Sequence, residues 1–268
     1  MSQPEPEPQI EIRDLTMAYG SFVLMRDLEF NINRGDIFII MGGSGCGKST
    51  LLRHLIGLKE PAKGEILYNG KSFTKAEAAE RETMIRKMGV MYQSGALWRS
   101  LTHAENVALP LEQNTKLVSA RVREIVSYKL SLVGLSGFED FYPAEISGGM
   151  CKRAGIARAM SLDPEVLFLD EPSAGLDPLS AQRLDEMILH LRDSLQTTIV
   201  VVTHELESIF TIANNSVFLD VTTRSQGAIG DPKVLRDSCP RDDIRLFLNR
   251  GIPDGATHSE PSASISSS

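Results

Sequence analysis

A loop of eight residues, Gly42–Ser49, constrains the fold of this chain more than any other feature. It reads GGSGCGKS and fits the pattern G-x-x-x-x-G-K-[ST], which is typical of a phosphate-binding loop. Such a loop joins a buried strand to a helix, because backbone N–H groups at the helix start point at the phosphates. The apolar run Asp36–Met41 and the helical pattern over Lys48–Leu58 supply both elements. The segment therefore predicts an α/β fold that binds a nucleoside triphosphate.

Two side chains of the loop carry specific chemistry in this prediction. The Lys48 ammonium reaches the β- and γ-phosphates, and the Ser49 hydroxyl is a ligand of Mg²⁺. The glycines allow the backbone to curl around the phosphates. The predicted nucleotide-binding residues of this region are Gly42, Gly43, Ser44, Gly45, Cys46, Gly47, Lys48, Ser49 and Thr50.

A second segment that favours anions follows about a hundred residues later. Ser147–Met150 reads SGGM and is typical of a helix start, with Ser147 as the N-cap. Ser147, Gly148 and Gly149 then present N–H donors that have no partner inside the helix. A chain with two anion sites is expected to do more than hold one nucleotide.

The composition of the 268-residue chain excludes several classes of protein. A net charge of −7 argues against a nucleic-acid binder, which normally has a basic face. No stretch approaches the roughly 18–20 uninterrupted apolar residues of a membrane span. Residues 1–9 are acidic and proline-rich, unlike a signal peptide.

The three cysteines, Cys46, Cys151 and Cys239, show no C-x-x-C spacing. Neither a zinc site nor a disulfide framework is therefore indicated, and we expect a reduced, cytoplasmic protein. A helix N-terminus can lower the pKa of a thiol such as that of Cys46. We favour the simpler interpretation that Cys46 is a small residue at a variable loop position.

The hydrophobic pattern predicts a parallel sheet covered on both faces, because continuous apolar runs alternate with helices after residue 147. The elements of this part are a Gly148–Leu162 helix, a Val166–Leu169 strand, a Leu179–Leu195 helix, a Thr198–Thr203 strand, closing strands at Val217–Asp220 and Gln226–Gly230, and a short helix at Arg241–Asn249.

The first half of the chain shows a different pattern. Ile10–Met17 and Phe22–Ile32 alternate as antiparallel strands do, and Gly64–Asn69 is a further strand. From Lys71 to about Glu145 the pattern is mostly helical, interrupted at Val90–Gln93. The predicted organisation is a flexible leader (residues 1–9), an α/β domain (10–240) with an inserted helical subdomain (about 94–160), and a C-terminal helix with a disordered tail (241–268).

Two adjacent carboxylates end the buried strand Val166–Leu169. Ligands bind beyond the carboxyl ends of strands in open α/β sheets, so Asp170 and Glu171 are expected near the phosphate loop. Asp170 is predicted to hold Mg²⁺ through a water molecule, together with Ser49. Glu171 is predicted to be the general base that activates the attacking water.

Gln93 and His204 each follow a predicted strand, Met88–Tyr92 and Thr198–Thr203. Taken singly, such residues are more often structural than catalytic. Because both emerge at the edge of the sheet that carries the loop, Gln93 is predicted to reach Mg²⁺ or the water, and His204 to donate to the γ-phosphate. We therefore expect Lys48, Gln93, Glu171 and His204 to form the catalytic set.

These motifs, in this order, resemble the ATPase of ABC transporters. The resemblance covers Tyr19 to about Gly230 and rests on the loop, Gln93, SGGM, Val166–Glu171, the AGLD of residues 174–177, and His204. It implies the P-loop NTPase core of the ABC ATPase type: a parallel sheet with flanking helices, an antiparallel β subdomain and an inserted helical subdomain. One departure is Met150, where the family most often has Gln.

The resemblance also implies roles that the residues alone do not. ABC ATPases work as head-to-tail dimers, so Ser147, Gly148 and Gly149 of one subunit would contact the γ-phosphate held by the other. Tyr19 would stack on adenine, and Asp177 would lie at the dimer seam. The implied ligands are ATP and Mg²⁺, and the implied assembly is a homodimer bound to an integral membrane permease.

A finer resemblance concerns the QSGALW of residues 93–98 and the SGGM followed by Arg153. Both are similar to the ATPase of Mla-type lipid transporters, although that group usually has Phe at the position of Trp98. Leu97 and Trp98 can equally be apolar core of the helical subdomain. The segment Asp243–Gly251 is also similar to the C-terminal region of this group.

The Mla-type resemblance implies ATP-driven transport of phospholipid or another hydrophobic molecule across or between envelope membranes of a Gram-negative bacterium. It also implies an Mce-type substrate-binding protein, a small cytoplasmic accessory subunit and a peripheral position on the cytoplasmic side of the inner membrane. Two alternatives stay open: the ATPase of another solute transporter, and a soluble ABC ATPase for cofactor assembly.

Overall fold

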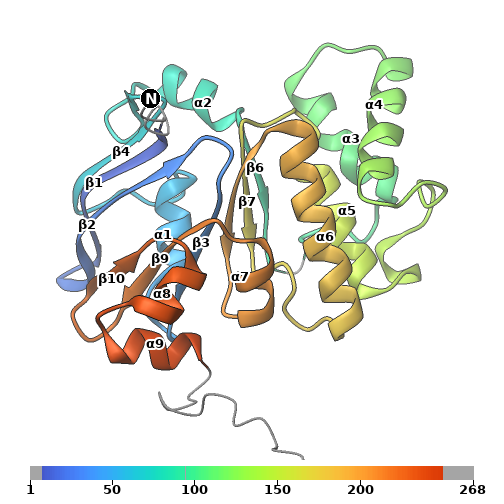
Figure 1. Cartoon of the computed structure of the whole chain (residues 1–268). Helices are drawn as coiled ribbons and strands as arrows, with labels where there is room; N and C mark the ends of the chain where they lie inside the picture. The colour runs from blue at the N-terminus through green and yellow to red at the C-terminus, as the bar shows by residue number, and fades with distance from the viewer. Residues whose placement is uncertain (1–7, 94, 250–268) are drawn as a thin grey trace, which may run out of the picture.

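A six-stranded sheet lies at the centre of the molecule, and its first strand in chain order is the one that enters the phosphate loop (Figure 1). The computed structural model describes residues 8–93 and 95–249. The strand order is β10-β9-β3-β8-β7-β6; all neighbours are parallel except β10 and β9. The strands are β3 (Ile37–Gly42), β6 (Met88–Met91), β7 (Val166–Asp170), β8 (Thr198–Val202), β9 (Asn215–Asp220) and β10 (Ser225–Ile229).

Both faces of this sheet are buried, which confirms the predicted covered parallel sheet. Strand β3 shows the pattern: Ile37, Ile39 and Met41 pack into one apolar core, whereas Phe38 and Ile40 pack into the other. Successive side chains of a strand point to opposite faces, so a strand with both faces covered needs apolar residues throughout. The sequence IFIIM meets this requirement.

A separate four-stranded antiparallel sheet packs over one of these cores, with the order β2-β1-β4-β5. The long strands β1 and β2 form the predicted hairpin, and Asn69-Gly70 forms the turn after β4. Helix α1 (Lys48–Leu55) lies in the same core and is shorter than predicted, because Gly57 follows it in a left-handed conformation. The strands are β1 (Pro8–Tyr19), β2 (Phe22–Asn33), β4 (Lys63–Tyr68) and β5 (Lys71–Ser72).

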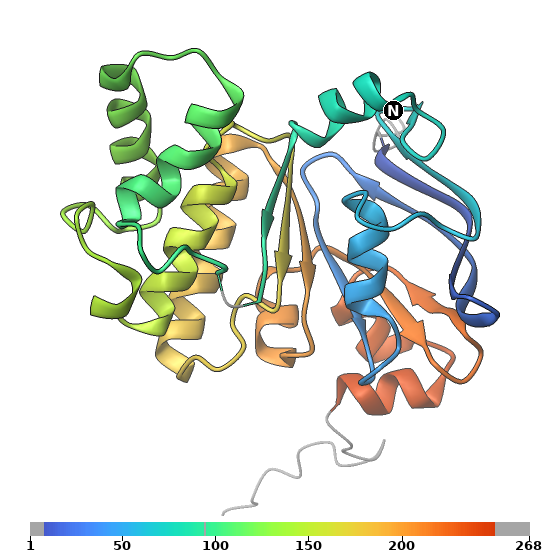
Figure 2. The same ribbon diagram turned by 180° about the vertical axis from the view of Figure 1, so that it is seen from behind.

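Three helices form a subdomain on the opposite side of the central sheet from the antiparallel sheet (Figures 1 and 2). They are α3 (His103–Asn114), α4 (Ser119–Leu132) and α5 (Gly148–Ala159), with a short 3-10 turn η1 (Pro143–Glu145) before α5. Thr102 and Glu105 form a reciprocal capping box at the start of α3. The helical character predicted for this part of the chain is thus confirmed.

Helix α2 (Ala78–Ile85) does not join these three helices, contrary to the prediction that extended the helical region back to Lys71. Its buried Met84 belongs to the core beneath the antiparallel sheet, and Arg81 pairs with Glu60. The helical pattern was read correctly there, but periodicity does not tell which neighbour a short helix packs against.

The C-terminal part contains α6 (Pro178–Leu195), α7 (Leu206–Ile212), α8 (Pro232–Ser238) and α9 (Asp242–Leu248). Helices α6 and α9 were predicted; the short helices α7 and α8 were not. Residues 1–7 and 250–268, which include most of the predicted leader and tail, lie outside the described residues. Across residues 8–93 and 95–249, no helix combines the length and apolar character needed to cross a membrane.

Candidate nucleotide site

The phosphate loop lines an open cleft of about 680 Å³ at the carboxyl edge of the central sheet. Three predicted catalytic side chains from other elements line it too: Gln93 after β6, Glu171 after β7 and His204 after β8. The sheet explains this gathering, because neighbouring parallel strands end at the same edge. The other lining residues are Tyr19, Leu24, Gly42, Gly43, Ser44, Gly45, Gly47, Lys48, Ser49, Thr50 and Phe247.

The loop begins where two chain segments approach so closely that only glycine fits. Gly42 has φ 143°, and a Cβ atom there would lie 2.4 Å from the carbonyl oxygen of Leu219 on β9. The Lys48 ammonium donates to the carbonyl oxygens of Gly42 at 2.9 Å and Gly43 at 3.1 Å. These two hydrogen bonds hold the ammonium beside the loop that is predicted to bind the phosphates.

Cys46 belongs to the loop but not to the lining of the cleft. Its side chain is fully buried in the core under the antiparallel sheet, and its N–H donates to the carbonyl of Gly43. Burial raises the pKa of the Cys46 thiol, which opposes the thiolate that a redox switch needs. The structure thus favours the interpretation of Cys46 as a small loop residue over a redox switch, and any contact of Cys46 with the nucleotide stays a prediction for its backbone.

Glu171 is held in an unusual conformation. Its φ of 49° lies in the left-handed region, which a non-glycine residue rarely adopts without local constraint. The Glu171 N–H donates to the carbonyl of Val202 at 2.8 Å, and one carboxylate oxygen contacts His204 Nδ1 at 2.8 Å. The other oxygen is buried and has no partner among residues 8–93 and 95–249. A buried free oxygen of this kind is suited to accept a proton from water.

Asp170 is partly buried at the end of β7 and, unlike Glu171, is not among the residues that line the cleft. Burial, and then the charge of Glu171, raises the pKa of Asp170, whereas a hydrogen bond from Ser49 acts in the opposite direction. One Asp170 oxygen, Oδ1, is buried without a partner in the described part of the chain. Ser49 and Asp170 thus lie side by side, and their shared role at Mg²⁺ stays a prediction.

The donor set fits Mg²⁺. The Ser49 hydroxyl, the Gln93 amide oxygen and the Asp170 carboxylate are oxygen ligands, which this hard cation prefers. An unpartnered Asp170 oxygen beside the Ser49 hydroxyl is the feature that a cation or its water would satisfy. Among the described residues there is no cluster of three or more His, Cys, Asp or Glu side chains of the kind that binds zinc.

Tyr19 is one of the residues that line the cleft, and 48% of its surface is exposed. Its hydroxyl lies 3.1 Å from the Thr50 hydroxyl, and this hydrogen bond is the main cause that lowers the pKa of Tyr19. The Lys59 ammonium lies 3.0 Å from the centre of the ring and also donates to the carbonyl of Ala18. One ring face is therefore covered by a cation.

Sequence reasoning missed two residues that line this cleft, Leu24 and Phe247, and also Lys59, which covers the ring of Tyr19. Leu24 comes from β2 and Phe247 from α9, far apart in the chain. Phe247 packs edge-on against Phe218 of β9, with ring centres 5.1 Å apart. No motif could have identified it, because its position depends on how α9 returns to the end of β9.

The second anion segment lies outside this cleft. Ser147 caps α5 by accepting a hydrogen bond from the Met150 N–H at 3.3 Å, which confirms the predicted helix start. Ser147 and Gly148 are exposed, and a Cβ atom at Gly148 would meet nothing within 4 Å. Asp177 is likewise absent from the cleft lining; it caps α6 through the Ser180 N–H.

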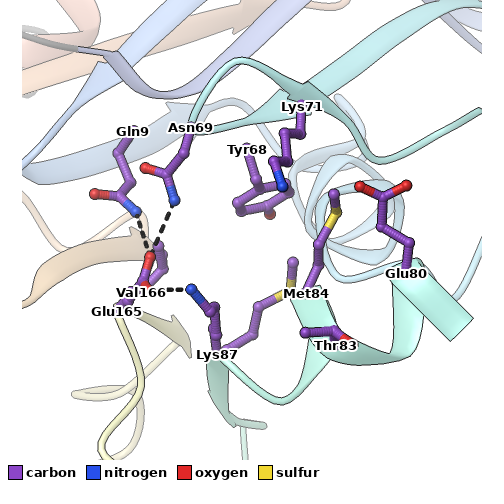
Figure 3. A pocket seen from close by; sticks show the side chains of 11 residues that line it. Gln9, Tyr68, Asn69, Lys71, Glu80, Thr83, Met84, Lys87, Glu165 and Val166 are labelled. Atoms are coloured by element: carbon purple, nitrogen blue, oxygen red, sulfur yellow. Dashed lines mark hydrogen bonds and ion pairs between the residues drawn. The ribbon is translucent and has the colours of Figure 1, made fainter. Parts of the chain in front are cut away.

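A smaller hollow, of about 260 Å³, opens at the amino edge of β6 and β7 (Figure 3). Glu165 there accepts hydrogen bonds from Gln9 at 3.3 Å and Asn69 at 3.0 Å, and pairs with Lys87 at 2.6 Å. Lys87, and after it the two amides, lower the pKa of Glu165 against the effect of burial. This carboxylate ties the antiparallel sheet to the central sheet.

Comparisons with known proteins agree with this geometry. The sequence model of the family described as "ABC transporter" matches residues 25–174. The chain is 38% identical over 240 residues to the "Probable ribonucleotide transport ATP-binding protein mkl" of Mycobacterium leprae, covering 90% of this chain and 68% of that protein. It is 35% identical over 246 residues to the "Intermembrane phospholipid transport system ATP-binding protein MlaF" of Escherichia coli K12, covering 92% of this chain and 90% of that protein.

Solved structures show the same fold. One is a dimeric ATP-binding cassette in a post-hydrolysis state with ADP and Pi, at 26% identity and a TM-score of 0.74, over 83% of this chain and 98% of that one. Another is cbiO1 from Clostridium perfringens, part of the ABC transporter complex cbiONQ. It has 25% identity and a TM-score of 0.79, over 92% of this chain and 100% of that one. The chain therefore belongs to the ABC transporter family, as an ATP-binding subunit that hydrolyses ATP.

Proposed function

We propose that this chain is the ATPase of a phospholipid transporter, working as a homodimer with two composite ATP sites. The observation that carries the dimer is the separation of the two anion segments. The cleft contains the loop, Gln93, Glu171 and His204, whereas Ser147 and Gly148 are exposed outside it. Head-to-tail pairing supplies the helix start of one subunit to the γ-phosphate held by the other.

In the proposed cycle, the loop N–H groups and Lys48 bind the phosphates of ATP. Ser49 and Gln93, with Asp170 through a water molecule, would hold Mg²⁺, which would neutralise phosphate charge. Glu171 Oε2 accepts the proton of the attacking water, and His204, oriented by Glu171 Oε1, donates to the γ-phosphate. Loss of the γ-phosphate removes the bridge between the subunits, so the dimer reopens.

The segment after Gln93 is the proposed contact with a membrane permease. Asn106 is fully buried and holds this segment by accepting from the Trp98 N–H at 2.8 Å and donating to the Trp98 carbonyl at 3.0 Å. Arg158 donates to the carbonyls of Gly95 and Ala96. The Trp98 side chain is nevertheless 60% exposed, which rules out the interpretation of Trp98 as core. An exposed aromatic on a fixed backbone is typical of a binding hot spot.

The phospholipid cargo rests on the similarity to MlaF of Escherichia coli, whose whole length this chain nearly covers. We extend the proposal to a peripheral position on the cytoplasmic side of the inner membrane, with an Mce-type substrate-binding protein and an accessory subunit. Another solute, such as the ribonucleotide in the name of the mycobacterial relative, is the competing cargo.

The test of the composite site is Ser147→Arg, which places a bulky side chain at the exposed helix start. Purified protein should keep ATP binding to its own loop but lose most ATPase activity, roughly a hundredfold, because a misplaced contact can have that effect. Full ATPase activity in this variant would overturn the dimeric site.

The test of partner and cargo uses Trp98→Ala in cells that express the complete chain with a tag. A permease should co-purify with the natural chain and be lost with the variant, while the ATPase activity of the isolated variant persists. Co-purification with soluble partners alone would favour cofactor assembly. Transfer of labelled phospholipid, but not of a ribonucleotide, by the reconstituted complex would establish the cargo.

A further inference from the structure

Lys152 is a buried ammonium on α5 that contacts the catalytic turn directly. It is 8% exposed and lies five residues after Ser147, the residue at the exposed start of the same helix. Its Nζ donates to the carbonyl oxygen of Glu171 at 3.4 Å and to that of Ala174. The Lys152 side chain therefore joins α5, the helix that begins at Ser147, to the turn that carries Glu171, the proposed base.

The turn that Lys152 holds is under local strain. Glu171 has φ 49°, and such a conformation persists only where the surroundings impose it. On one side the Glu171 N–H is fixed by the Val202 carbonyl. Lys152 contacts the carbonyl side of the same residue, so we expect its removal to loosen the backbone that aims the Glu171 side chain at His204.

The partners of Lys152 are also informative. Its hydrogen bonds go to backbone carbonyls, and burial lowers the pKa of Lys152 while the charge of Glu171 acts in the opposite direction. A buried charge needs well-aligned partners to offset desolvation. By contrast, Lys129, which is 2% exposed, forms an ion pair with Asp163.

We propose that Lys152 is a positioning residue that couples the two ATP sites of the dimer. When Ser147 meets the γ-phosphate held by the partner, any shift of α5 is passed by Lys152 to the Glu171 of its own subunit, which serves the other site. Occupation of one site thus adjusts the base of the other. The inference rests on the proposed composite sites and adds a physical link between them.

The coupling has a measurable signature. ATP hydrolysis by the full-length protein should be cooperative in ATP, because occupation of one site adjusts the base of the other. The Hill coefficient should lie above 1 and cannot exceed about 2, the number of linked sites. Lys152→Met should bring the coefficient to 1 and lower kcat roughly tenfold, with little change in KM, because a misplaced base affects the chemical step more than binding. Lys152→Arg should retain part of the cooperativity.

Lys129→Met is the matched control, because it removes another buried lysine, which lies on α4 and pairs with Asp163 rather than with the catalytic turn. It is expected to lower stability while leaving kcat within twofold and the Hill coefficient unchanged. Thermal unfolding of both variants separates a positioning effect from loss of fold.

The outcomes discriminate between the two proposals. A natural protein without cooperativity, or a Lys152→Met variant that keeps both cooperativity and kcat, overturns the coupling. A Lys152→Met variant that behaves like Lys129→Met, with lowered stability alone, overturns it as well. Full activity of Ser147→Arg instead overturns the composite site itself, whatever Lys152→Met does.

Discussion

Two glutamates flank the same buried strand, and they differ in how many of their carboxylate oxygens have a hydrogen-bond partner. Glu165 precedes β7 at the amino edge, where two amides and an ammonium occupy its oxygens. Glu171 follows β7 at the carboxyl edge, with one oxygen on His204 and the other unpartnered among residues 8–93 and 95–249. The saturated carboxylate joins two sheets, and the unsaturated one remains available for chemistry.

The contrast extends to the neighbouring lysines. Lys87 is paired with Glu165, whereas Lys48 is held by two carbonyls that a phosphate can replace. At the carboxyl edge, Lys48 therefore bonds only to neutral carbonyl groups, which bind an ammonium more weakly than a charged phosphate does. This difference can be tested by removing one group at a time at each edge.

The largest expected effect is that of Glu171→Gln. Replacing the carboxylate should lower kcat by about 10²–10⁴, because the amide cannot accept the proton of the attacking water. ATP binding should persist, so the variant should accumulate as a closed dimer in size-exclusion chromatography with ATP. Turnover equal to that of the natural protein would refute the assigned base.

Lys48→Ala should have the next largest effect. Loss of a charge-assisted contact with phosphate is worth about 1.5–3 kcal/mol, so ATP affinity should fall roughly ten- to a hundredfold. Isothermal titration calorimetry measures this directly. Lys87→Ala is the control at the other edge and should leave ATP affinity unchanged; equal losses in both variants would erase the contrast between the edges.

Tyr19 sharpens the contrast within the cleft itself. Tyr19→Ala should weaken ATP binding by roughly tenfold, since stacking on a base is worth about 1–3 kcal/mol. Tyr19→Phe keeps the ring and loses only the hydrogen bond with Thr50, so it should bind ATP within about threefold of the natural protein. A Tyr19→Ala variant with undiminished affinity would contradict stacking at this position.

The smallest effect is expected for Glu165→Gln. The pair with Lys87 is partly exposed, so its loss should lower the free energy of unfolding by about 1 kcal/mol or less, without altering kcat. Because the folded pKa of Glu165 is lowered, this stability is present above the unfolded pKa of about 4.5 and is lost as pH falls from there through the folded pKa. Urea unfolding at pH 7 and at about pH 3 should therefore show a smaller difference between the two proteins at the lower pH.

A larger loss of activity in Glu165→Gln than in Glu171→Gln would reverse the roles assigned to the two edges. Similar unfolding differences at both pH values would show that Glu165 acts through packing rather than through its charge.

Local pattern was sufficient for much of the fold and of the cleft. The apolar run of β3, the glycine loop and the start of α1 follow from backbone requirements within a dozen residues, so the sequence identifies them directly. Glu171 and His204 were also predictable, because parallel strands bring their carboxyl ends to one edge. Helices α7 and α8 were not identified from the sequence, although α9, which has the same length, was.

Other features depend on distances that no motif records. The side on which α2 packs, the exposure of Trp98, the burial of Cys46 and the cation on the face of Tyr19 were each decided by neighbours remote in the chain. The same holds for Phe247 at the cleft and for Lys152 on the Glu171 carbonyl.

The sequence by itself determined the phosphate loop, the carboxylates after β7 and the helix start at Ser147, because each is a local arrangement of backbone and adjacent side chains. Tertiary structure alone decided which hydrogen-bond partners each of the two glutamates beside β7 has. That outcome depends on which donors from distant segments reach each carboxylate, and only the packing of the two sheets sets those distances.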